Sequence, residues 1–448
     1  MNPNVVMSIA GSDPSAGAGI QADLKSFSFL NIHGVTVVSC VTSQNTRRVT
    51  DIHRIPLEII ESQIDILFED FSIKAVKTGL LYDEKIIRLV SKKLSDYHML
   101  PVVDPVMVAT SGDIISQNNY VAAFKKYLLP QSFILTANIS EASVLSGMAI
   151  ETIEDVKKSC KKLYDLGSAN VLIKGGHLDT VDAVDVFYDG RKFHTFSLPR
   201  LPNKKAHGSG CSLSAIIAGL LAQGELPVAA VKKAKYIIWS MMYDGYTIGK
   251  GADVLNHSCD AVVPFNVQKQ QVDTWVELHN AVEQLISFLP PSFVPEVGMN
   301  FVYALENATS FEEICAVDGR IIYTKDHVKR CGTVSFGVSR HVASIVLSAL
   351  SFDKNCRSVL NIRYSKQTLE LCKKAGFRLG FFDRKNEPKN VSSTMEWGTT
   401  QAITDLGFVP DIIYDIGGVG KEPMIRILGK NPKDVLLKTK KLLNIHIR

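Results

Sequence analysis

The sequence predicts two α/β domains in one chain. From the N-terminus to about residue 255, short apolar runs alternate with amphipathic helical patterns, which is typical of a mostly parallel sheet covered by helices on both faces. The chain has 448 residues, which is too long for one ordinary domain. A second strand and helix alternation begins near Pro295. We therefore expect a larger sheet-and-helix domain followed by a second, smaller α/β domain.

Short apolar runs mark the strands of the first domain. The expected strands are Val5–Ala10, Val35–Val41, Ile73–Thr78, Pro101–Asp104, Phe133–Thr136 and Val171–Lys174. Amphipathic spacing predicts helices between them at Pro56–Glu69, Glu84–Asp96 and Ile153–Leu166. A hairpin is expected next, followed by two helices: Ala183–Tyr188 with Lys192–Ser197, then Gly210–Gln223 and Pro227–Thr247. Such sheets bind ligands beyond the carboxyl ends of their strands.

The chain then passes through a polar stretch into the second domain. We assign residues 1–257 to the first domain, 258–294 to a linker with a connecting helix at Asp273–Phe288, and 295–448 to the second domain. Expected strands of the second domain are Arg357–Ile362, Arg378–Phe382 and Asp411–Asp415. Its expected helices are His341–Leu350, Gln367–Lys374, Thr399–Leu406 and Pro432–Leu443.

Composition excludes several classes of protein. Hydrophobic residues make up 46% and charged residues 21% of the chain, as in globular proteins. No apolar run approaches the ~18 residues that span a bilayer, and the N-terminus lacks the pattern of a signal peptide, so we expect a cytoplasmic protein with reduced cysteines. The net charge is +5, but no basic stripe is interleaved with aromatic residues, so nucleic-acid binding is not expected.

Two glycine-rich segments of the first domain suit anion binding. Residues 11–19, GSDPSAGAG, directly follow the first strand and lack the lysine of a P-loop; a tight turn is the alternative. Gly208 and Gly210 open a later helix, whose N-terminal N–H groups can stabilise a transferring phosphoryl group. Cys211 falls in the first turn of that helix, where its thiol pKa should fall. It can then accept a proton from a substrate hydroxyl; the alternative is a small buried side chain.

Further polar residues follow strands of the same domain. Asn138 and Glu141 stand three residues apart at a predicted helix start, where their oxygen atoms can hold a hydrated Mg²⁺ near phosphates. Simple capping of the helix is the alternative. Asp104 and Lys174 each end an expected strand. The sequence thus predicts one polar site at the carboxyl edge of the sheet.

Together these motifs resemble the hydroxymethylpyrimidine and phosphomethylpyrimidine kinases of thiamine biosynthesis, a ribokinase-like family. The matching phrases are SIAGSDPSAGAGIQADLKSF, VTSQNT, KTG, DPVMVATSG, TANISEA, KGGH and HGSGCSLSAIIAGL. The resemblance implies a ribokinase-like fold and ATP-dependent phosphorylation of the pyrimidine alcohol and then of its monophosphate. It also admits a homo-oligomer, because ribokinase-like enzymes are often dimers. Pyridoxal kinases share this fold, so a kinase acting also on pyridoxal remains an alternative.

The resemblance implies roles for single residues. Asp23 and Gln44 should hydrogen-bond the aminopyrimidine ring, beside Gly11. Cys211 stands where sugar kinases of the superfamily carry an aspartate base. The expected cofactors are ATP and Mg²⁺, with Glu141 on the metal. The residues assigned to the ATP site are Asp104, Asn138, Lys174, Gly208 and Gly210.

The second domain has its own set of phosphate-binding candidates. A guanidinium group can bind two phosphate oxygens at once, and Arg340 and His341 stand at the start of an expected helix. We expect Arg320, Arg340 and His341 to hold phosphates and a leaving group, with Lys421 in support. Second candidates are Asn361, Arg363, Asp383 and Glu396. The alternative for any single arginine is a surface ion pair.

From about residue 295 the chain resembles the ThiN-type thiamine-phosphate synthase domain. The matching phrases are PEVGMNFVYAL, DGRI, FGVSRHVASIVLSAL, NIRYS, FDR, STMEWGT and PDIIYDIGGVGKEPMIRILG. The resemblance implies condensation of the pyrimidine diphosphate with thiazole phosphate, which gives thiamine phosphate and pyrophosphate. Domains of this type also serve as ligand-sensing halves of transcription regulators. A kinase fused to a non-catalytic thiamine-phosphate-sensing module is therefore the rival hypothesis.

Overall fold

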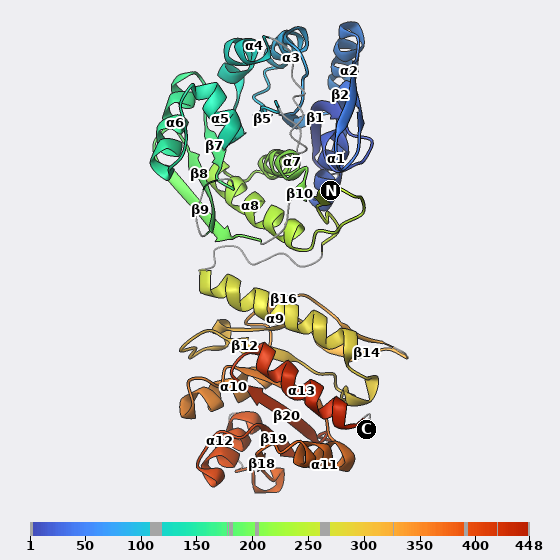
Figure 1. Ribbon diagram of the computed structural model, residues 1–448, viewed down its shortest axis with the longest axis vertical. Coiled ribbons are helices and arrows are strands. Elements are labelled where there is room, and N and C mark those ends of the chain that lie inside the picture. The colour runs from blue at the N-terminus through green and yellow to red at the C-terminus, as the bar shows by residue number, and fades with distance from the viewer. Residues whose placement is uncertain are drawn as a thin grey trace. The chain divides into compact units, whose positions relative to one another are not determined.

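The computed structural model divides into two compact units, Met1–Phe265 and Asn266–Arg448 (Figure 1). It describes residues 3–107, 119–176, 178, 182–201, 206–259, 269–325, 327–388, 393–418 and 420–446. Both units are α/β, as the sequence predicts. No helix in these ranges combines the length and apolar character needed to cross a membrane.

A nine-stranded sheet runs through the first unit, in the order β3-β2-β1-β4-β5-β6-β7-β8-β9. The strands β2, β1, β4, β5, β6 and β7 are parallel. At one edge β3 pairs antiparallel with β2, and at the other β8 pairs antiparallel with β7 and β9 with β8. The strand bounds are β1 Val5–Ser12, β2 His33–Gln44, β3 Val49–Arg54, β4 Ile73–Thr78, β5 Val102–Val103, β6 Ile134–Asn138, β7 Val171–Lys174, β8 Asp182–Tyr188 and β9 Phe193–Pro199. All six predicted strands and the hairpin are confirmed; β3, half exposed and polar, was not predicted.

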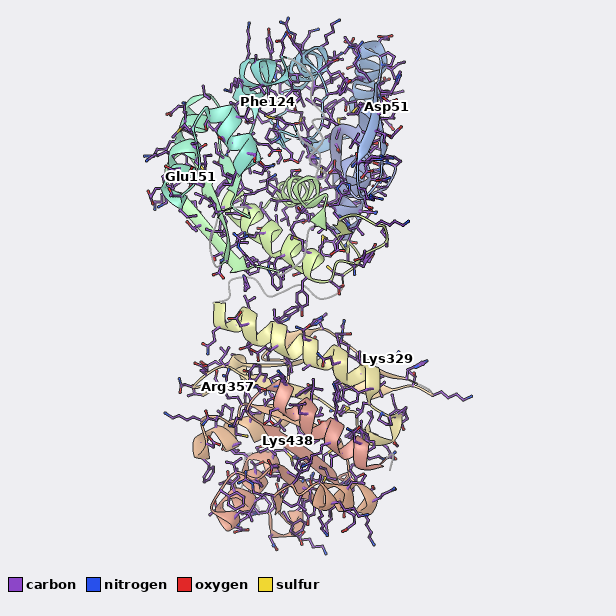
Figure 2. The ribbon with its side chains drawn as sticks, in the orientation of Figure 1. Asp51, Phe124, Glu151, Lys329, Arg357 and Lys438 are labelled. Carbon is purple, nitrogen blue, oxygen red and sulfur yellow. The ribbon has the colours of Figure 1, made fainter. Side chains whose placement is uncertain are left out.

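Helices cover both faces of this sheet. One face carries α1 Gly19–Phe29, α7 Ser209–Ala222 and α8 Pro227–Tyr243. The other carries α2 Leu57–Asp70, α3 Glu84–Asp96, α4 Tyr120–Ala123, α5 Ile139–Ser146 and α6 Ile153–Asp165. Alternation along β1 explains the two layers: Val6 packs into one core, and Met7 and Ile9 into the other. Phe124, after α4, is fully buried in the helical layer beside α3 (Figure 2).

The second unit is built on a seven-stranded, mostly antiparallel sheet in the order β16-β13-β12-β17-β20-β19-β18. Its strands are β12 Phe301–Ala304, β13 Ile314–Val317, β16 Val334–Phe336, β17 Ser358–Arg363, β18 Leu379–Phe381, β19 Ile412–Asp415 and β20 Met424–Gly429, with a separate ribbon of β14 Ile321–Tyr323 and β15 Val328–Arg330. The helices α10 His341–Phe352 and α12 Thr394–Leu406 pack on one face. On the other lie α9 Lys269–Phe288 and α13 Pro432–His446, with α11 Lys366–Lys374 beside α13. Lys438 of α13 pairs with Asp411 at 2.9 Å (Figure 2).

The helix that the sequence assigned to the connecting segment belongs to the second unit. Helix α9 packs against β12, β13 and β16. Its Trp275 is buried and donates a hydrogen bond from Nε1 to the carbonyl oxygen of Val334 at 2.8 Å. The second unit therefore begins before residue 295. Residues 260–268 of the expected linker lie outside the described residues.

Candidate active sites

The polar residues predicted for the first unit gather at the carboxyl edge of its sheet. Gln44, Asn138 and Lys174 are the last residues of β2, β6 and β7, and Asp104 directly follows β5. The N-terminus of α7 comes to the same edge. A methyl group on Gly210 would lie 3.2 Å from Nζ of Lys174 and 3.6 Å from Oδ2 of Asp104. The structure thus brings the predicted anion-binding helix end next to the charged strand ends.

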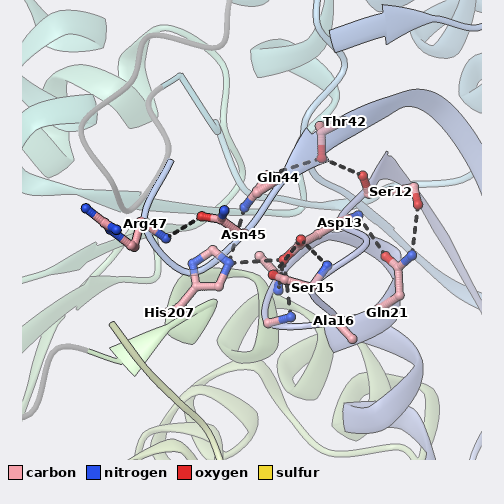
Figure 3. Close-up of polar contacts among 12 residues, drawn as sticks. Ser12, Asp13, Ser15, Ala16, Gln21, Thr42, Gln44, Asn45, Arg47 and His207 are labelled. Carbon is pink, nitrogen blue, oxygen red and sulfur yellow. Dashed lines mark hydrogen bonds and ion pairs between the residues drawn. The ribbon is translucent and has the colours of Figure 1, made fainter. Parts of the chain in front are cut away.

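Asp13 organises the glycine-rich loop, a role that the sequence did not reveal. Its carboxylate accepts hydrogen bonds from the backbone N–H groups of Ser15 (2.9 Å), Gly17 (3.2 Å) and Ala18 (2.8 Å), as Figure 3 shows in part. Burial raises the pKa of Asp13, but hydrogen bonds from His207, Ser15 and Ala18 outweigh it and lower the pKa to about 2. Asp13 therefore holds this loop in one conformation as a carboxylate.

The two glycine-rich loops pack against each other. A Cβ atom on Gly208 would lie 1.8 Å from the carbonyl oxygen of Gly17, and Gly208 has a φ of +80°. His207 is within hydrogen-bond distance of Asp13 on one side, 3.0 Å from Nε2 to Oδ2, and of Gln44 on the other, 3.2 Å from Nε2 to Nε2 (Figure 3). Gly11 is similarly confined, because a Cβ there would lie 2.9 Å from the sulfur of Cys40. Because Gln44 contacts His207 of one loop, and His207 contacts Asp13 of the other, Gln44 lies beside both loops.

Cys211 lies in the first turn of α7, as predicted, but its predicted low pKa is wrong. Burial raises the pKa of the thiol to about 11. The positive charge of Lys77 and a hydrogen bond from the backbone N–H of Gly19 act in the opposite direction without outweighing burial. The thiol is therefore protonated at neutral pH in this state of the protein.

Asp23 occupies a different place from the one its predicted role requires. Asp23 belongs to α1, and its side chain is fully buried. The carboxylate contacts Nζ of Lys77 at 2.8 and 3.0 Å and accepts a hydrogen bond from the hydroxyl of Ser8 at 2.5 Å. Because none of this side chain reaches solvent, the arrangement argues against a direct hydrogen bond from Asp23 to a pyrimidine ring.

Asn138 and Glu141 form a capping box at the start of α5, which is the alternative to a metal site at this position. Oδ1 of Asn138 accepts from the backbone N–H of Glu141 at 2.9 Å, and the carboxylate of Glu141 accepts from the backbone N–H of Asn138 at 2.8 Å. Burial, followed by repulsion from Asp104, raises the pKa of Glu141 to about 7 against the attraction of Lys174. Lys174 pairs with Asp104 at 3.1 Å. Lys174 thus pairs with Asp104 and acts electrostatically on Glu141. The oxygen atoms of these two carboxyl groups are of the type that fits a divalent cation carrying phosphates and water.

In the second unit, His341 lies among arginines at the start of α10. Partial desolvation of its imidazole, together with the charges of Arg426, Arg384 and Arg320, lowers the pKa of His341 to about 4. Arg320 donates a hydrogen bond to the carbonyl oxygen of Val297. Of the predicted phosphate ligands, Arg320 therefore acts electrostatically on His341. Arg340 is the exposed residue that precedes the helix.

Arg384, Asp415 and Arg426 complete this cluster, and of these Asp415 and Arg426 were not predicted. Asp415 is fully buried and accepts from Nε and Nη2 of Arg384 at 2.7 and 3.2 Å, and from Nη2 of Arg426 at 2.7 Å. Arg426 also stacks over the ring of Phe382. An arginine inside the apolar strand MIRILG was the signal that could have revealed the cluster. Two buried guanidinium groups share one carboxylate, so the cluster favours an anion.

The remaining candidates are engaged elsewhere in the second unit. Oδ1 of Asn361 accepts from the backbone N–H of Asn300 at 2.7 Å, and Arg363 pairs with Glu296 at 2.9 Å. Lys421 lies 3.4 Å from Glu387. Asp383 and Glu396 stand at helix starts: Asp383 accepts from the backbone N–H of Lys385, and the N–H of Glu396 donates to Ser393. Residues 108–112, His177 and Val419 of the quoted motifs lie outside the described residues.

Two protein families match this chain. The family described as phosphomethylpyrimidine kinase matches residues 13–256, and the family described as thiamine-phosphate synthase ThiN matches residues 277–441. A bifunctional thiamine biosynthesis protein, ThiDN, of Methanocaldococcus jannaschii is 32% identical over 99% of both chains. The bifunctional ThiED of Geobacter sulfurreducens is 40% identical over 56% of this chain, which spans only 52% of that relative.

Solved structures resemble the first unit. The pyridoxal kinase of Staphylococcus aureus in complex with AMP-PCP and pyridoxal is 32% identical, with a TM-score of 0.53, over 57% of this chain and 94% of that one. The ADP complex of Bacillus subtilis pyridoxal kinase is also 32% identical, with a TM-score of 0.54, over 57% of this chain and 98% of that one. The ribokinase-like fold is thereby confirmed. The chain belongs to the family of bifunctional thiamine biosynthesis enzymes that join a phosphomethylpyrimidine kinase to a ThiN-type thiamine-phosphate synthase.

Proposed function

We propose that Cys211 is the general base for the first of two phosphorylations in the first unit. Its thiolate takes the proton of the hydroxymethyl group of the pyrimidine. The freed oxygen then forms a bond to the γ-phosphorus of ATP, while the bond between that phosphorus and the bridging oxygen breaks and ADP leaves with the electron pair. The position of Cys211 at the N-terminus of α7 supports this proposal. The preceding residue, Gly210, lies beside Lys174 and Asp104, so N–H groups and an ammonium group there can stabilise the transferring phosphoryl group.

The substrates are expected on either side of Cys211. Gln44 faces the glycine-rich loops, where its amide can donate to and accept from the ring and amine of an aminopyrimidine. Lys174, Gly208 and Gly210 are expected to contact ATP phosphates. When bound, Mg²⁺ would be held near Asp104 and Glu141, with Asn138 fixing the orientation of Glu141, and would screen the charge of the phosphates.

In the second unit, we propose that the arginine cluster binds the diphosphate of the activated pyrimidine. The bond between the methylene carbon and the diphosphate oxygen breaks, and pyrophosphate leaves with the electron pair. The thiazole nitrogen then donates its lone pair to the methylene carbon, which gives the thiazolium of thiamine phosphate. Arg320, Arg384 and neutral His341 would stabilise the leaving group, because guanidinium groups bind phosphates with two parallel hydrogen bonds.

The matching full-length relative supports a synthase over a sensing module, since it is a bifunctional biosynthesis protein. The direct test gives the full chain pyrimidine diphosphate and thiazole phosphate without ATP. Appearance of thiamine phosphate and pyrophosphate is the expected result. Binding of thiamine phosphate without any turnover would overturn the proposal in favour of the sensing module.

Activity on pyridoxal is the second candidate for the first unit, because pyridoxal kinases are among the solved structures that resemble it. The assay supplies ATP with either hydroxymethylpyrimidine or pyridoxal and compares kcat/KM. A value at least tenfold higher for the pyrimidine is expected. Equal values would identify a kinase of broad specificity.

A further inference from the structure

A buried ion pair lies beneath the kinase site and has no role in the reaction described so far. Lys77 of β4 and Asp23 of α1 are both 0% exposed, and Nζ of Lys77 lies 2.8 Å from Oδ2 of Asp23. Ser8 donates a hydrogen bond to the same carboxylate oxygen. A Cβ atom on Gly79 would lie 2.9 Å from Nζ of Lys77, so the glycine leaves room for the ammonium group. With no exposed surface, neither side chain can contact a ligand directly.

A buried ion pair contributes little net stability to a protein core. Removal of two charges from water costs several kcal/mol for each ion, and apolar replacements of buried ion pairs are often neutral or stabilising. Stability alone therefore does not account for the pair. Its surroundings suggest another use, because α7, which carries Cys211, packs on both β4 and α1.

The charge of Lys77 acts on the thiol of Cys211. Burial lowers the pKa of Lys77, but Asp23, followed by Cys211 and Asp104, raises it to about 12, so the ammonium group stays protonated at all pH values relevant to catalysis. Among the charged neighbours of Cys211, Lys77 has the largest effect and lowers the pKa of the thiol, while Asp104 and Asp23 raise it by smaller amounts. The ion pair therefore acts on the sulfur atom mainly through its positive end, Lys77.

We propose that Lys77, held in place by Asp23, is a positioning residue whose permanent positive charge stabilises the thiolate of Cys211 during proton transfer from the pyrimidine alcohol. This inference rests on the proposed role of Cys211 as a base. It also replaces the expected role of Asp23, which would act through Lys77 and not on the ring.

The two phosphorylations should depend differently on the charge of Lys77. The first nucleophile is a hydroxyl group that must lose a proton. The second nucleophile is an oxygen of a phosphate monoester, whose second pKa is about 6, so it carries no proton at pH 7.5 and needs no base. The charge of Lys77 should therefore matter for the first phosphorylation and hardly at all for the second. A purely structural role would slow both.

The test removes both charges together, because either charge alone would be left unpaired in the core. The variant is Lys77→Met/Asp23→Asn in the full chain, and Lys77→Gln/Asp23→Asn, which keeps a hydrogen bond, serves if the first does not fold. Alkylation of Cys211 by iodoacetamide is followed by peptide mass spectrometry as a function of pH. The two phosphorylations are measured separately at pH 7.5 with ATP and either substrate.

We expect the alkylation midpoint of Cys211 to rise by about one pH unit, the first phosphorylation to slow about tenfold, and the second to change less than twofold. A matched control is Lys235→Met/Asp185→Asn, which removes another largely buried pair, 2.9 Å apart, in the same unit; it should leave the midpoint unmoved. An unchanged midpoint in the Lys77 variants, or equal slowing of both steps, would overturn the inference. If Cys211 is not the base, the Cys211→Ala variant should phosphorylate hydroxymethylpyrimidine at an undiminished rate. That result would be distinguishable from failure of the role of Lys77.

Discussion

His207 and Asp13 lie 194 residues apart in the sequence, yet their side chains meet at 3.0 Å and join the two glycine-rich loops of the kinase site. The same imidazole lies beside Gln44. One histidine thus links the loop that follows β1, the loop that opens α7 and the residue expected to bind the pyrimidine.

Asp13→Asn should lower stability and weaken pyrimidine binding. The pKa of Asp13 is depressed to about 2 in the folded protein, against 3.8 for an unperturbed carboxyl group, so its contribution is present above pH 4 and is lost as the pH falls through 4 to 2. Urea unfolding at pH 7 should show a loss of about 1–3 kcal/mol, and KM for hydroxymethylpyrimidine should rise.

Asp189→Asn is the matched control for Asp13. Asp189 also has a pKa of about 2, caps a turn and pairs with a histidine, His194, but it lies in the β8–β9 hairpin. This variant should be less stable than the unaltered protein at pH 7, should lose less stability than it as the pH falls from 4 to 2, and should leave KM unchanged. If both variants raised KM equally, the link from Asp13 to the pyrimidine site would be wrong.

Cys211→Ala should slow the phosphorylation of hydroxymethylpyrimidine by about 10²–10⁴-fold, the usual contribution of a general base, and slow the phosphorylation of the monophosphate far less. Because the thiol has a pKa of about 11, the first step in the unaltered enzyme should also accelerate as the pH rises from 7 to 10. Separate assays of the two steps across this range check both statements. A flat pH profile for the first step would remove Cys211 as the base.

Gly208→Ala should abolish the kinase while sparing the synthase. The new Cβ would lie 1.8 Å from the carbonyl oxygen of Gly17, so the two loops cannot keep their contact. Gly224→Ala is the control, because Gly224 also has a positive φ, +92°, but no atom within 4 Å of the added group. It should cost about 1 kcal/mol of stability and no activity. Kinase assays and thermal unfolding of both variants distinguish loop contact from backbone strain.

Arg384→Ala should reduce thiamine phosphate formation about 100-fold without slowing either phosphorylation. The loss follows from removal of a diphosphate ligand and of one partner of Asp415. Arg378→Ala removes a more exposed arginine that pairs with Asp411 at 3.4 Å, and it should leave synthesis unchanged. Normal coupling by the Arg384 variant would place the diphosphate elsewhere.

The sequence predicted elements whose amphipathic pattern is strong and missed those that depend on distant partners. Glu84–Asp96 appears with the predicted bounds because its amphipathic spacing determines which face is buried, and Val171–Lys174 does so because it is a continuous apolar run between polar segments. The short strands β12, β13 and β16 were not predicted. The first two are apolar runs that are buried throughout, but runs of three or four residues cannot be distinguished by periodicity from a turn of buried helix until they pair across the sheet. Strand ends located Asp104 and Lys174 correctly at one edge.

The sequence did not reveal which polar side chains are buried, because their burial depends on residues that are distant along the chain. The resemblance places Asp23 at the pyrimidine ring, whereas in the folded unit its carboxylate is buried against Lys77 of β4. The thiol of Cys211 has the predicted helix position, yet burial outweighs the helix end and raises its pKa. Asp415 and Arg426 are remote from His341 along the chain and become its neighbours only in the folded unit.

A single reaction mixture shows whether the two units carry out the two phosphorylations and the coupling reaction in sequence. It contains the purified full chain, ATP, Mg²⁺, hydroxymethylpyrimidine and thiazole phosphate, and it is analysed for thiamine phosphate by chromatography. The account predicts thiamine phosphate with two ADP and one pyrophosphate formed for each molecule. Accumulation of the pyrimidine diphosphate without thiamine phosphate would contradict it, since the second unit would then bind its ligands without joining them.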